Sequence, residues 1–415
     1  MKVLGMKVQP LFPSLADTQS KNLSDYPSLE KLRKGLNQPD WWPEFWQQTF
    51  QFLRFIGRNK SLSTYERFRS ESERYGNWLM NTQTDPFQIK KQGILKYVDW
   101  LVAPKKELIG TANQARFVLQ EGLWQPNPQW RAFVARKPKG LKVSEDYQPA
   151  DHYQPSQESI AAAFTAISAL YKFWIDEDLV TGNPVPSAKR DCRHLIKMAQ
   201  ARPVHRLNDL QWDVLLDTAQ RLADEDSNYE RHLFLIAALK GLFLRISELA
   251  EHDGWIPQMN HFFQEEGYWW LQVYGKGRKI REVSVPESFL PFLVRYRQSR
   301  GLGDLPAPNE QEVILAKLRG RGAMTSRHLR RLVQEVFDAA VAQLKAEGFK
   351  QDAQELSAAT THWLRHTGAS MDVENDRDIK HISEDLGHAS VATTDRVYVQ
   401  ADRRRRAESG RGRKI

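Results

Sequence analysis

Apolar residues recur every three to four positions along much of the first half of the chain, which is the spacing of one face of a helix. In segment 63–82, Ser63 or Thr64 can cap the start, and the apolar face consists of Tyr65, Phe68, Tyr75 and Leu79. Segments 86–102 and 156–180 repeat the pattern. Together these segments predict a helical first domain.

This helical domain is expected to span residues 46–200, with Ser156 as the N-cap of its last long helix. A proline-rich stretch near 124–156 interrupts it, and we expect a surface insertion or long loop there. Ahead of the domain, residues 1–45 hold prolines among polar side chains, which predicts an extended N-terminal leader. An aromatic cluster would dock this leader onto the helices: Trp41, Trp42, Phe45 and Trp46.

A second domain is predicted for residues 203–400. Glycine and proline in segment 180–190 end the preceding helix, and Asn208 is placed to open a new one. Segment 229–252 has the pattern of one buried helix, because apolar residues recur on one side of it: Leu235, Leu239, Leu242, Ile246 and Leu249.

The second domain also contains strands. Residues 268–274 and 280–285 have strand-like sequences, and Gly275 and Gly277 mark a turn between them, which predicts a β-hairpin. Residues 401–415 form a basic C-terminal tail. The fold is therefore expected to be mainly α with a small β component, a helical domain followed by a mixed α/β domain.

Composition narrows the range of partners and locations. A net charge of +9 over 415 residues favours an anionic partner such as nucleic acid. The single cysteine, Cys192, excludes an intrachain disulfide and fits a reducing compartment. The chain lacks an apolar run long enough to span a membrane and a signal-peptide core. A cytoplasmic, nucleoid-associated location is expected, with no membrane partner.

Two segments of the second domain concentrate charge. Arg245 lies within the predicted buried helix, where Glu248 can pair with it; taken alone, this is a structural ion pair. The hairpin tip carries a cluster of basic residues: Lys276, Arg278, Lys279 and Arg281. This cluster could contact DNA, although it is also typical of a solvated turn. The spacing of a nucleotide-binding phosphate loop is absent from this segment.

The segment THWLRHTG places His362, Arg365 and His366 on one helical turn. The four-residue spacing of the two histidines also suits a metal. A zinc protease would need glutamate where Trp363 stands, so no metal site is expected here. His366 is expected to serve in packing or in support of the other two side chains.

Two further candidates lie near the end of the chain. His388 follows Gly387, which suits a tight turn, and Ser390 can cap the next helix. Tyr398 lies ten residues after His388. Each of them, taken alone, is more often a structural residue.

In order along the chain, six of these residues resemble the catalytic set of the tyrosine recombinase (phage integrase) family: Arg245, Lys276, His362, Arg365, His388 and Tyr398. The resemblance covers about the last half of the chain. It implies that Tyr398 attacks a DNA phosphate that Arg365 holds, and that His362 acts as the general base. It further implies that His388 donates to a nonbridging phosphate oxygen and that Lys276 protonates the leaving 5′ oxygen.

The same resemblance implies partners and a product. A core-binding domain and a catalytic domain would close as a C-shaped clamp on double-stranded DNA, with a homo-tetramer on synapsed sites and accessory directionality proteins. Cleavage would give a 3′-phosphotyrosyl link without metal, ATP or another cofactor. Lys279 replaces Lys276 as general acid if the hairpin register is shifted. The leader and the insertion favour the integrase of a mobile element.

Two alternatives use the same fold or chemistry. A type IB topoisomerase would relax DNA without strand exchange between sites. A catalytically silent DNA-binding or architectural protein would need only the charge, and the complete set of six residues argues against it. The tail 401–415 departs from the family because it has almost no apolar residues with which to dock on a neighbouring protomer.

Overall fold

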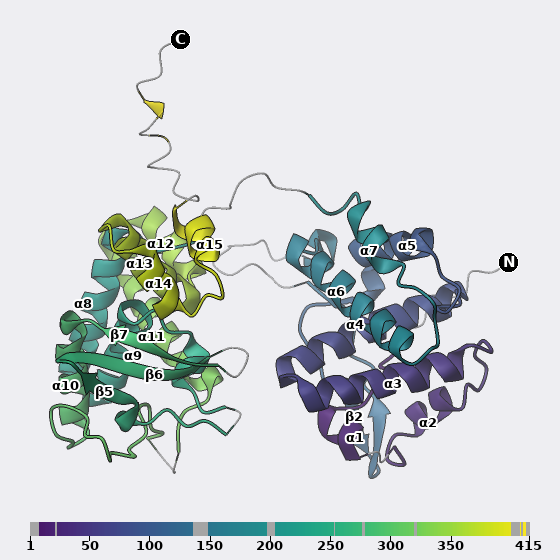
Figure 1. Ribbon diagram of the computed structural model, residues 1–415, viewed down its shortest axis with the longest axis horizontal. Coiled ribbons are helices and arrows are strands. Elements are labelled where there is room, and N and C mark those ends of the chain that lie inside the picture. Colours follow the sequence, from purple (N-terminus) through teal and green to yellow (C-terminus); the bar gives the residue numbers. More distant parts are fainter. Residues whose placement is uncertain are drawn as a thin grey trace. The chain divides into compact units, whose positions relative to one another are not determined.

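The computed structural model describes residues 8–20, 23–135, 148–196, 204–252, 254–275, 279–318 and 322–399, together with 407, 410 and 411. The chain divides into two compact units, residues 1–197 and 198–415, which are described separately (Figure 1). Both are mainly helical and carry only small sheets, which confirms the predicted fold class. No helix in the described ranges is long and apolar enough to cross a membrane.

Unit 1 is a helical body with two small pairs of strands. Its helices are α1 (Leu15–Ser20), α2 (Pro27–Arg33), α3 (Trp42–Asn59), α4 (Leu62–Thr82), α5 (Lys91–Val102), α6 (Gln157–Asp176) and α7 (Val185–Arg190), with short η1 (Lys106–Leu108) and η2 (Pro149–His152). Ser156 caps α6 as predicted, accepting a hydrogen bond from the Ser159 N–H. The cap of α4 is Ser61, whose hydroxyl accepts from Thr64, so the prediction of Ser63 or Thr64 was wrong by two or three residues.

The prediction of an extended leader was wrong for the described part of residues 1–45. This segment carries α1 and α2, and Leu11 and Phe12 are fully buried. The indole N–H of Trp46 donates to the carbonyl of Leu11 at 2.9 Å, and that of Trp42 donates to Leu32 at 2.9 Å. The predicted aromatic cluster does anchor the segment, which is part of the core of unit 1.

The predicted insertion near 124–156 is in part ordered structure. Strand β2 (Phe117–Gln120) pairs antiparallel with β3 (Leu123–Pro126), and β1 (Ile109–Gly110) pairs parallel with β4 (Phe133–Val134). Trp124 stacks on Tyr26 of the N-terminal segment, with ring centroids 6.1 Å apart. Residues 136–147 lie outside the described ranges.

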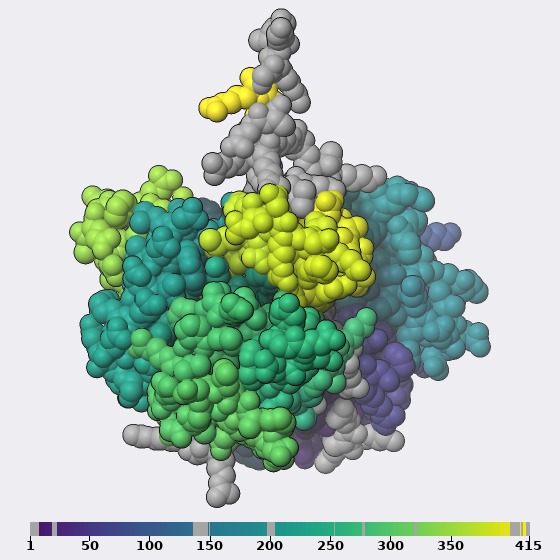
Figure 2. All heavy atoms as spheres, turned by 60° about the vertical axis from the view of Figure 1, so that its left-hand side comes forward, coloured from purple at the N-terminus to yellow at the C-terminus, as the bar shows by residue number. Residues whose placement is uncertain are grey.

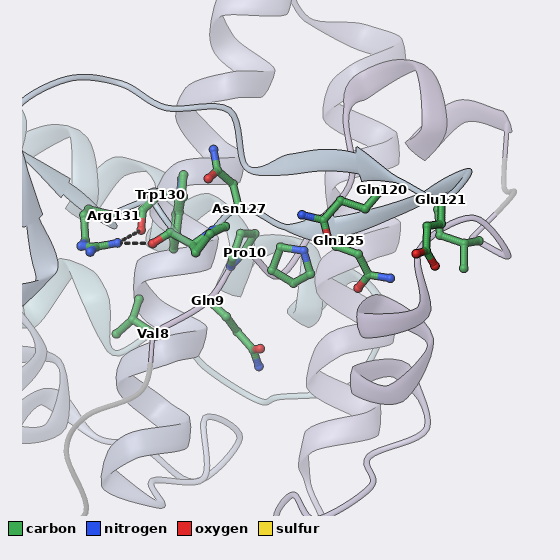
Figure 3. A pocket seen from close by; sticks show the side chains of 12 residues that line it. Val8, Gln9, Pro10, Gln120, Glu121, Gln125, Asn127, Trp130 and Arg131 are labelled. Carbon is green, nitrogen blue, oxygen red and sulfur yellow. Dashed lines mark hydrogen bonds between the residues drawn. The ribbon is translucent and has the colours of Figure 1, made fainter.

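A pocket of about 840 Å³ opens beside the β2–β3 hairpin (Figure 3). Most of its polar groups are the neutral carboxamides of Gln9, Gln120, Gln125 and Asn127. The guanidinium of Arg131 in its wall donates to the carbonyls of Pro128 and Trp130, at 2.7 and 2.8 Å. The lining therefore holds four carboxamides and two charged side chains, Glu121 and Arg131.

Unit 2 surrounds helix α9 (Glu230–Gly241), which is buried on nearly all sides. Packed against it are α8 (Asp209–Glu225), α10 (Leu290–Ser299), α11 (Ser326–Ala346) and α13 (Thr361–Glu374). The remaining helices are α12 (Lys350–Ala358), α14 (Ile379–Leu386) and α15 (Val391–Thr394). Short turns of helix complete the unit: η3 (Ser227–Tyr229), η4 (Ile246–Leu249), η5 (Met259–His261), η6 (Glu287–Phe289) and η7 (Asp395–Val399). Asn208 caps α8 in a capping box with Gln211, as predicted.

The sheet of unit 2 has the order β5-β6-β7 and is antiparallel. Its strands are β5 (Phe262–Glu265), β6 (Tyr268–Gly275) and β7 (Lys279–Val285). The pairing of Gly275 with Lys279 confirms the predicted hairpin. Lys276 and Arg278 at its tip lie outside the described residues. Helix α14 packs on β7, and Figure 2 shows the C-terminal segments in yellow above the green part of this unit.

Helix α13 approaches the end of α9 closely at Gly368. A Cβ at this position would lie 2.1 Å from the carbonyl oxygen of Lys240 and 2.8 Å from the ring of Phe243. Only glycine permits this contact without a shift of the backbone. The contact sets the position of the helix that carries His362, Arg365 and His366.

Candidate active site

Separate elements of unit 2 bring the described members of the candidate set together. Arg245 precedes η4, His362 and Arg365 lie on α13, His388 follows α14, and Tyr398 lies in η7. Electrostatic interactions link Arg365 with Arg245 and with Tyr398, and link His388 with both arginines. Lys276 is the one member of the set that falls outside the described residues.

Arg245 does not lie in a helix, so the prediction of one helix through 229–252 was wrong. Helix α9 ends at Gly241, and Phe243 adopts a left-handed φ of 49° that breaks the helical path. The chain is extended at Arg245 and then enters η4, which brings Glu248 back to it. The backbone N–H and the Nη1 of Arg245 donate to the two carboxylate oxygens of Glu248, at 2.8 and 3.0 Å.

Arg281 was predicted to contact DNA from the basic hairpin tip, but its side chain is engaged within the protein. Its Nη1 and Nη2 donate to the two oxygens of Glu248 at 2.7 and 2.9 Å, and its Nε donates to the carbonyl of Asp385 at 3.0 Å. Its side chain is only 13% exposed. Arg281 therefore ties β7 to η4 and to the end of α14, while its neighbour Lys279 is exposed.

Glu248 is the fully buried centre of this network. Burial alone would raise its pKa, but hydrogen bonds and charge from Arg281, and then from Arg245, outweigh burial and lower the pKa below its ordinary value. Glu248 is consequently a carboxylate that holds two arginines in fixed positions.

Arg365 is 2% exposed, and both of its described hydrogen bonds go to backbone carbonyls. Its Nη1 donates to Phe243, and its Nη2 donates to Leu386 at 2.5 Å. Burial and the charge of Arg245 lower its pKa to about 10, so it remains a cation at neutral pH. A buried cation whose described hydrogen bonds go to carbonyl dipoles is costly even with the charge of Glu248 acting on it, and an incoming anion would offset that cost.

His388 sits in the tight turn that was predicted for it. Gly387 has a φ of 61°, and Ser390 caps α15 by accepting from the Ala392 N–H. The Nδ1 of His388 lies 2.7 Å from the hydroxyl of Thr394. Burial, followed by the charge of Arg365, lowers the pKa of His388 to about 4, so the ring is neutral at pH 7.

Tyr398 is 5% exposed, and its hydroxyl lies 2.7 Å from Nδ1 of His366. Burial raises the phenol pKa to about 12, against the opposing effect of the charges of Arg365 and Arg245. His366 was expected to serve in packing or in support of His362 and Arg365, and its ring nitrogen directly contacts the phenol of Tyr398. The signal for this role was present, because His366 lies one helical turn after His362 and directly follows Arg365.

His362 is exposed at the surface of unit 2, with its ring centroid 5.8 Å from that of His366. The protein packed around the ring, and then the charges of Arg365 and Arg245, lower its pKa. The structure therefore gathers neutral histidines around cationic arginines. Within the described ranges, no cluster of three His, Cys, Asp or Glu side chains could hold a metal ion.

Comparisons with known proteins identify relatives of this chain. The sequence model of the phage integrase family matches residues 205–405. Tyrosine recombinase XerC of Pseudomonas putida is 27% identical over 253 residues, which cover 60% of this chain and 72% of XerC. Its counterpart in Salmonella typhi is 27% identical over 246 residues, covering 59% and 69%.

Solved structures share the fold. The XerH site-specific recombinase bound to palindromic difH substrate, in a post-cleavage complex, has a TM-score of 0.57 at 15% identity, covering 95% of this chain and 92% of that one. A Tn1549 transposon integrase in complex with circular intermediate DNA has a TM-score of 0.50 at 17% identity, covering 88% and 98%. Residues 205–405 therefore belong to the phage integrase family of tyrosine recombinases.

Proposed function

We propose that this protein is a site-specific DNA recombinase that cuts and rejoins duplex DNA through a 3′-phosphotyrosyl link to Tyr398, without metal or ATP. The observation that carries the proposal is the pairing of a buried cation with a buried phenol. Arg365 has only carbonyl partners among its described hydrogen bonds, and the charges of Arg365 and Arg245 act on the Tyr398 hydroxyl. A phosphodiester is the anion that would use both groups.

The chemistry follows from these groups. The phenol oxygen of Tyr398 attacks the scissile phosphorus, the bond from phosphorus to the 5′ oxygen breaks, and the 5′ hydroxyl leaves. Arg365 and Arg245 hold the negative charge that builds on the phosphate, where fixed cations in a dry site are most effective. His388 donates through Nε2, the ring nitrogen that does not face Thr394, and Lys276 is the proposed acid for the 5′ oxygen.

The raised pKa of Tyr398 fits an enzyme that attacks only when its substrate is in place. A phenol pKa about two units above the ordinary 10 disfavours free phenolate by roughly 3 kcal/mol. The phenol therefore stays protonated in the absence of DNA, and as a protonated phenol it is a poor nucleophile. Rejoining is the same step in reverse, with a 5′ hydroxyl as nucleophile and the tyrosine as leaving group.

The partners follow from the same proposal. Double-stranded DNA is the substrate, unit 1 serves as the core-binding domain, and four protomers act on two synapsed sites, with accessory proteins setting direction. The net charge of +9 supports a nucleic-acid partner. Similarity to a transposon integrase supports a role as the integrase of a mobile element.

The experiment starts from a library of duplexes with randomised sequence, from which the protein selects the DNA that it binds. The selected duplexes are nicked next to each possible cleavage position, so that the released strand diffuses away and the covalent adduct is trapped. Wild type should form an adduct in EDTA that resists detergent, and Tyr398→Phe should form none. Bound DNA without any adduct would contradict the recombinase, and an adduct with Tyr398→Phe would show that another residue attacks.

A further inference from the structure

Two histidines of α13 compete for the role of the base that accepts the phenolic proton. His366 reaches the nucleophile, since its Nδ1 lies 2.7 Å from the Tyr398 hydroxyl. His362 makes no hydrogen bond to Tyr398 within the described part of the chain, and its ring lies against that of His366, at a centroid distance of 5.8 Å and an interplanar angle of 25°. His362 is also exposed, which suits a contact with bound DNA rather than with the buried phenol.

We propose that His366, in place of His362, holds the hydroxyl of Tyr398 and takes its proton as the phenol attacks. This inference rests on the proposed function, because it names the proton acceptor of that reaction. His362 is left free to meet the phosphate from the solvent side.

The direction of the hydrogen bond follows from the protonation states. Burial, and then the nearby His362, Arg365, His388 and His205, lower the pKa of His366 to about 4, so the ring is neutral and one of its nitrogens has no proton. Tyr398 keeps its proton, since its pKa is raised to about 12. The phenol O–H accordingly donates, and Nδ1 accepts.

The same values exclude transfer of the proton before attack. With pKa values of about 12 and about 4, phenolate and imidazolium are disfavoured by roughly eight powers of ten. The proton therefore moves while the bond from phenol oxygen to phosphorus forms, when that oxygen loses its basicity. The bond between phosphorus and the 5′ oxygen breaks, and the leaving oxygen takes a proton from the general acid. During rejoining, the imidazolium of His366 returns its proton to the departing phenol.

The surroundings of the ring keep this geometry fixed. Tyr398 packs in a small apolar cluster with Phe243, Ala369, Val373, Ile382 and Leu386. It lies in a π-helical turn, Asp395–Val399, a form of helix that is frequent at functional sites. The cluster holds the ring and His366 holds the hydroxyl, which fixes the phenol oxygen relative to the nitrogen that accepts its proton.

The test measures the rate of adduct formation on the selected nicked DNA. For His366→Leu we expect a loss of roughly 100- to 10,000-fold, the usual contribution of a general base. The rate for His366→Asn should fall between those of wild type and His366→Leu, because the amide oxygen of asparagine can accept the hydrogen bond but cannot take the proton. His381→Leu is the matched control, since His381 is an exposed histidine of the same unit, and its rate should not change.

A second measurement separates proton transfer from a merely structural role. Tyr398 is replaced by a fluorinated tyrosine whose phenol pKa lies below that of tyrosine. The lower pKa should restore much of the rate in His366→Leu and little of it in Arg365→Ala, because only the first variant lacks a proton acceptor. DNA binding and the melting temperature of each variant establish that it is folded, and His366→Asn serves if His366→Leu does not fold.

The outcomes are distinct. If folded His366→Leu or His366→Asn forms the adduct at the wild-type rate, His366 is not the acceptor. If the fluorinated tyrosine restores His366→Leu no better than Arg365→Ala, the role of His366 is structural and the inference is overturned. If wild type itself forms no adduct on bound DNA, the proposed function fails before the question of the base arises.

Discussion

Replacing Glu248 by glutamine would test whether a buried carboxylate holds the site together. Each oxygen of Glu248 accepts two N–H groups, one from Arg245 and one from Arg281, at 2.7 to 3.0 Å. Glutamine keeps the shape, but its NH₂ group would face two donors in either orientation of the amide. Two of the four hydrogen bonds are then lost, and two guanidinium groups lose their counter-charge.

Removing one partner of a buried ion pair costs about 3 to 5 kcal/mol. For a domain of 150–250 residues this corresponds to a fall in Tm of roughly 6 to 20 °C, at about 2–4 °C per kcal/mol. Scanning calorimetry of the full chain should show one transition displaced by this amount for Glu248→Gln. A transition that arises from unit 1 should stay in place and serve as an internal reference.

The control is Glu225→Gln, which removes the charge from an exposed pair with Arg221 in the same unit. Its Tm should change little, because exposed pairs contribute about 0–1 kcal/mol. The pKa of Glu248 is lowered in the folded protein, so its contribution is full above the ordinary value of 4.5 and is lost as pH falls through the folded value. If Glu248→Gln has the melting temperature of the wild type at pH 7, the buried carboxylate does not hold the site together.

Three further predictions concern α13 and its neighbours. Gly368→Ala should destabilise unit 2 by about 1–3 kcal/mol and impair cleavage, measured by calorimetry and by adduct yield, because the new Cβ would lie 2.1 Å from the Lys240 carbonyl oxygen. The free energy of unfolding should fall as the pH is lowered from 6.5 to 4. His366 and His388 have pKa values lowered to about 4 in the folded protein, so the unfolded chain binds protons at these histidines at a higher pH than the folded one. Glutamine at both positions should flatten this pH dependence of the melting temperature. Thr394→Val should slow adduct formation roughly tenfold, because the His388 ring loses one hydrogen bond. DNA binding should be unchanged.

Local signals in the sequence were enough to predict several features of the fold. Asn208 with Gln211 forms a capping box, and the two strand-like segments around Gly275 form the β6–β7 hairpin. Both features depend on residues close together in the chain, whose backbone preferences act before any tertiary contact. The turn at Gly387 belongs to the same class, since a left-handed φ favours glycine there.

The errors arose where apolar residues are buried from several sides. Beyond Gly241 the apolar run continues, but the chain leaves the helix at Phe243, and a periodic pattern cannot distinguish the two paths. The prediction of an extended leader fails for a related reason, because prolines at the starts of α2 and α3 are compatible with helix. Tertiary packing of Leu11 decides the outcome there.

The basic neighbours of Arg281 predict that it lies on the DNA-contacting surface, but the alternation of buried and exposed positions along β7 indicates a buried face. Arg281 lies two residues before Val283 and four before Val285, both buried, so it shares their face of β7. A cation on a buried face needs a carboxylate, and Glu248 supplies it from another element. That partner could not be identified from the sequence, because 33 residues separate the two.

The net charge of the described site matches the charge of a phosphate under attack more closely than that of an unreacted phosphodiester. Arg245, Arg281 and Arg365 carry three positive charges and Glu248 one negative, while His366, His388 and Tyr398 are neutral at pH 7, which leaves a net charge of two positive. A phosphodiester carries one negative charge, and the pentacoordinate species that forms during attack carries two. In the reaction that we propose, fixed cations stabilise the transition state more than the bound substrate, which is the condition for faster chemistry rather than tighter binding. Because Glu248 fixes two of these cations and backbone carbonyls fix the third, the arrangement exists before DNA arrives.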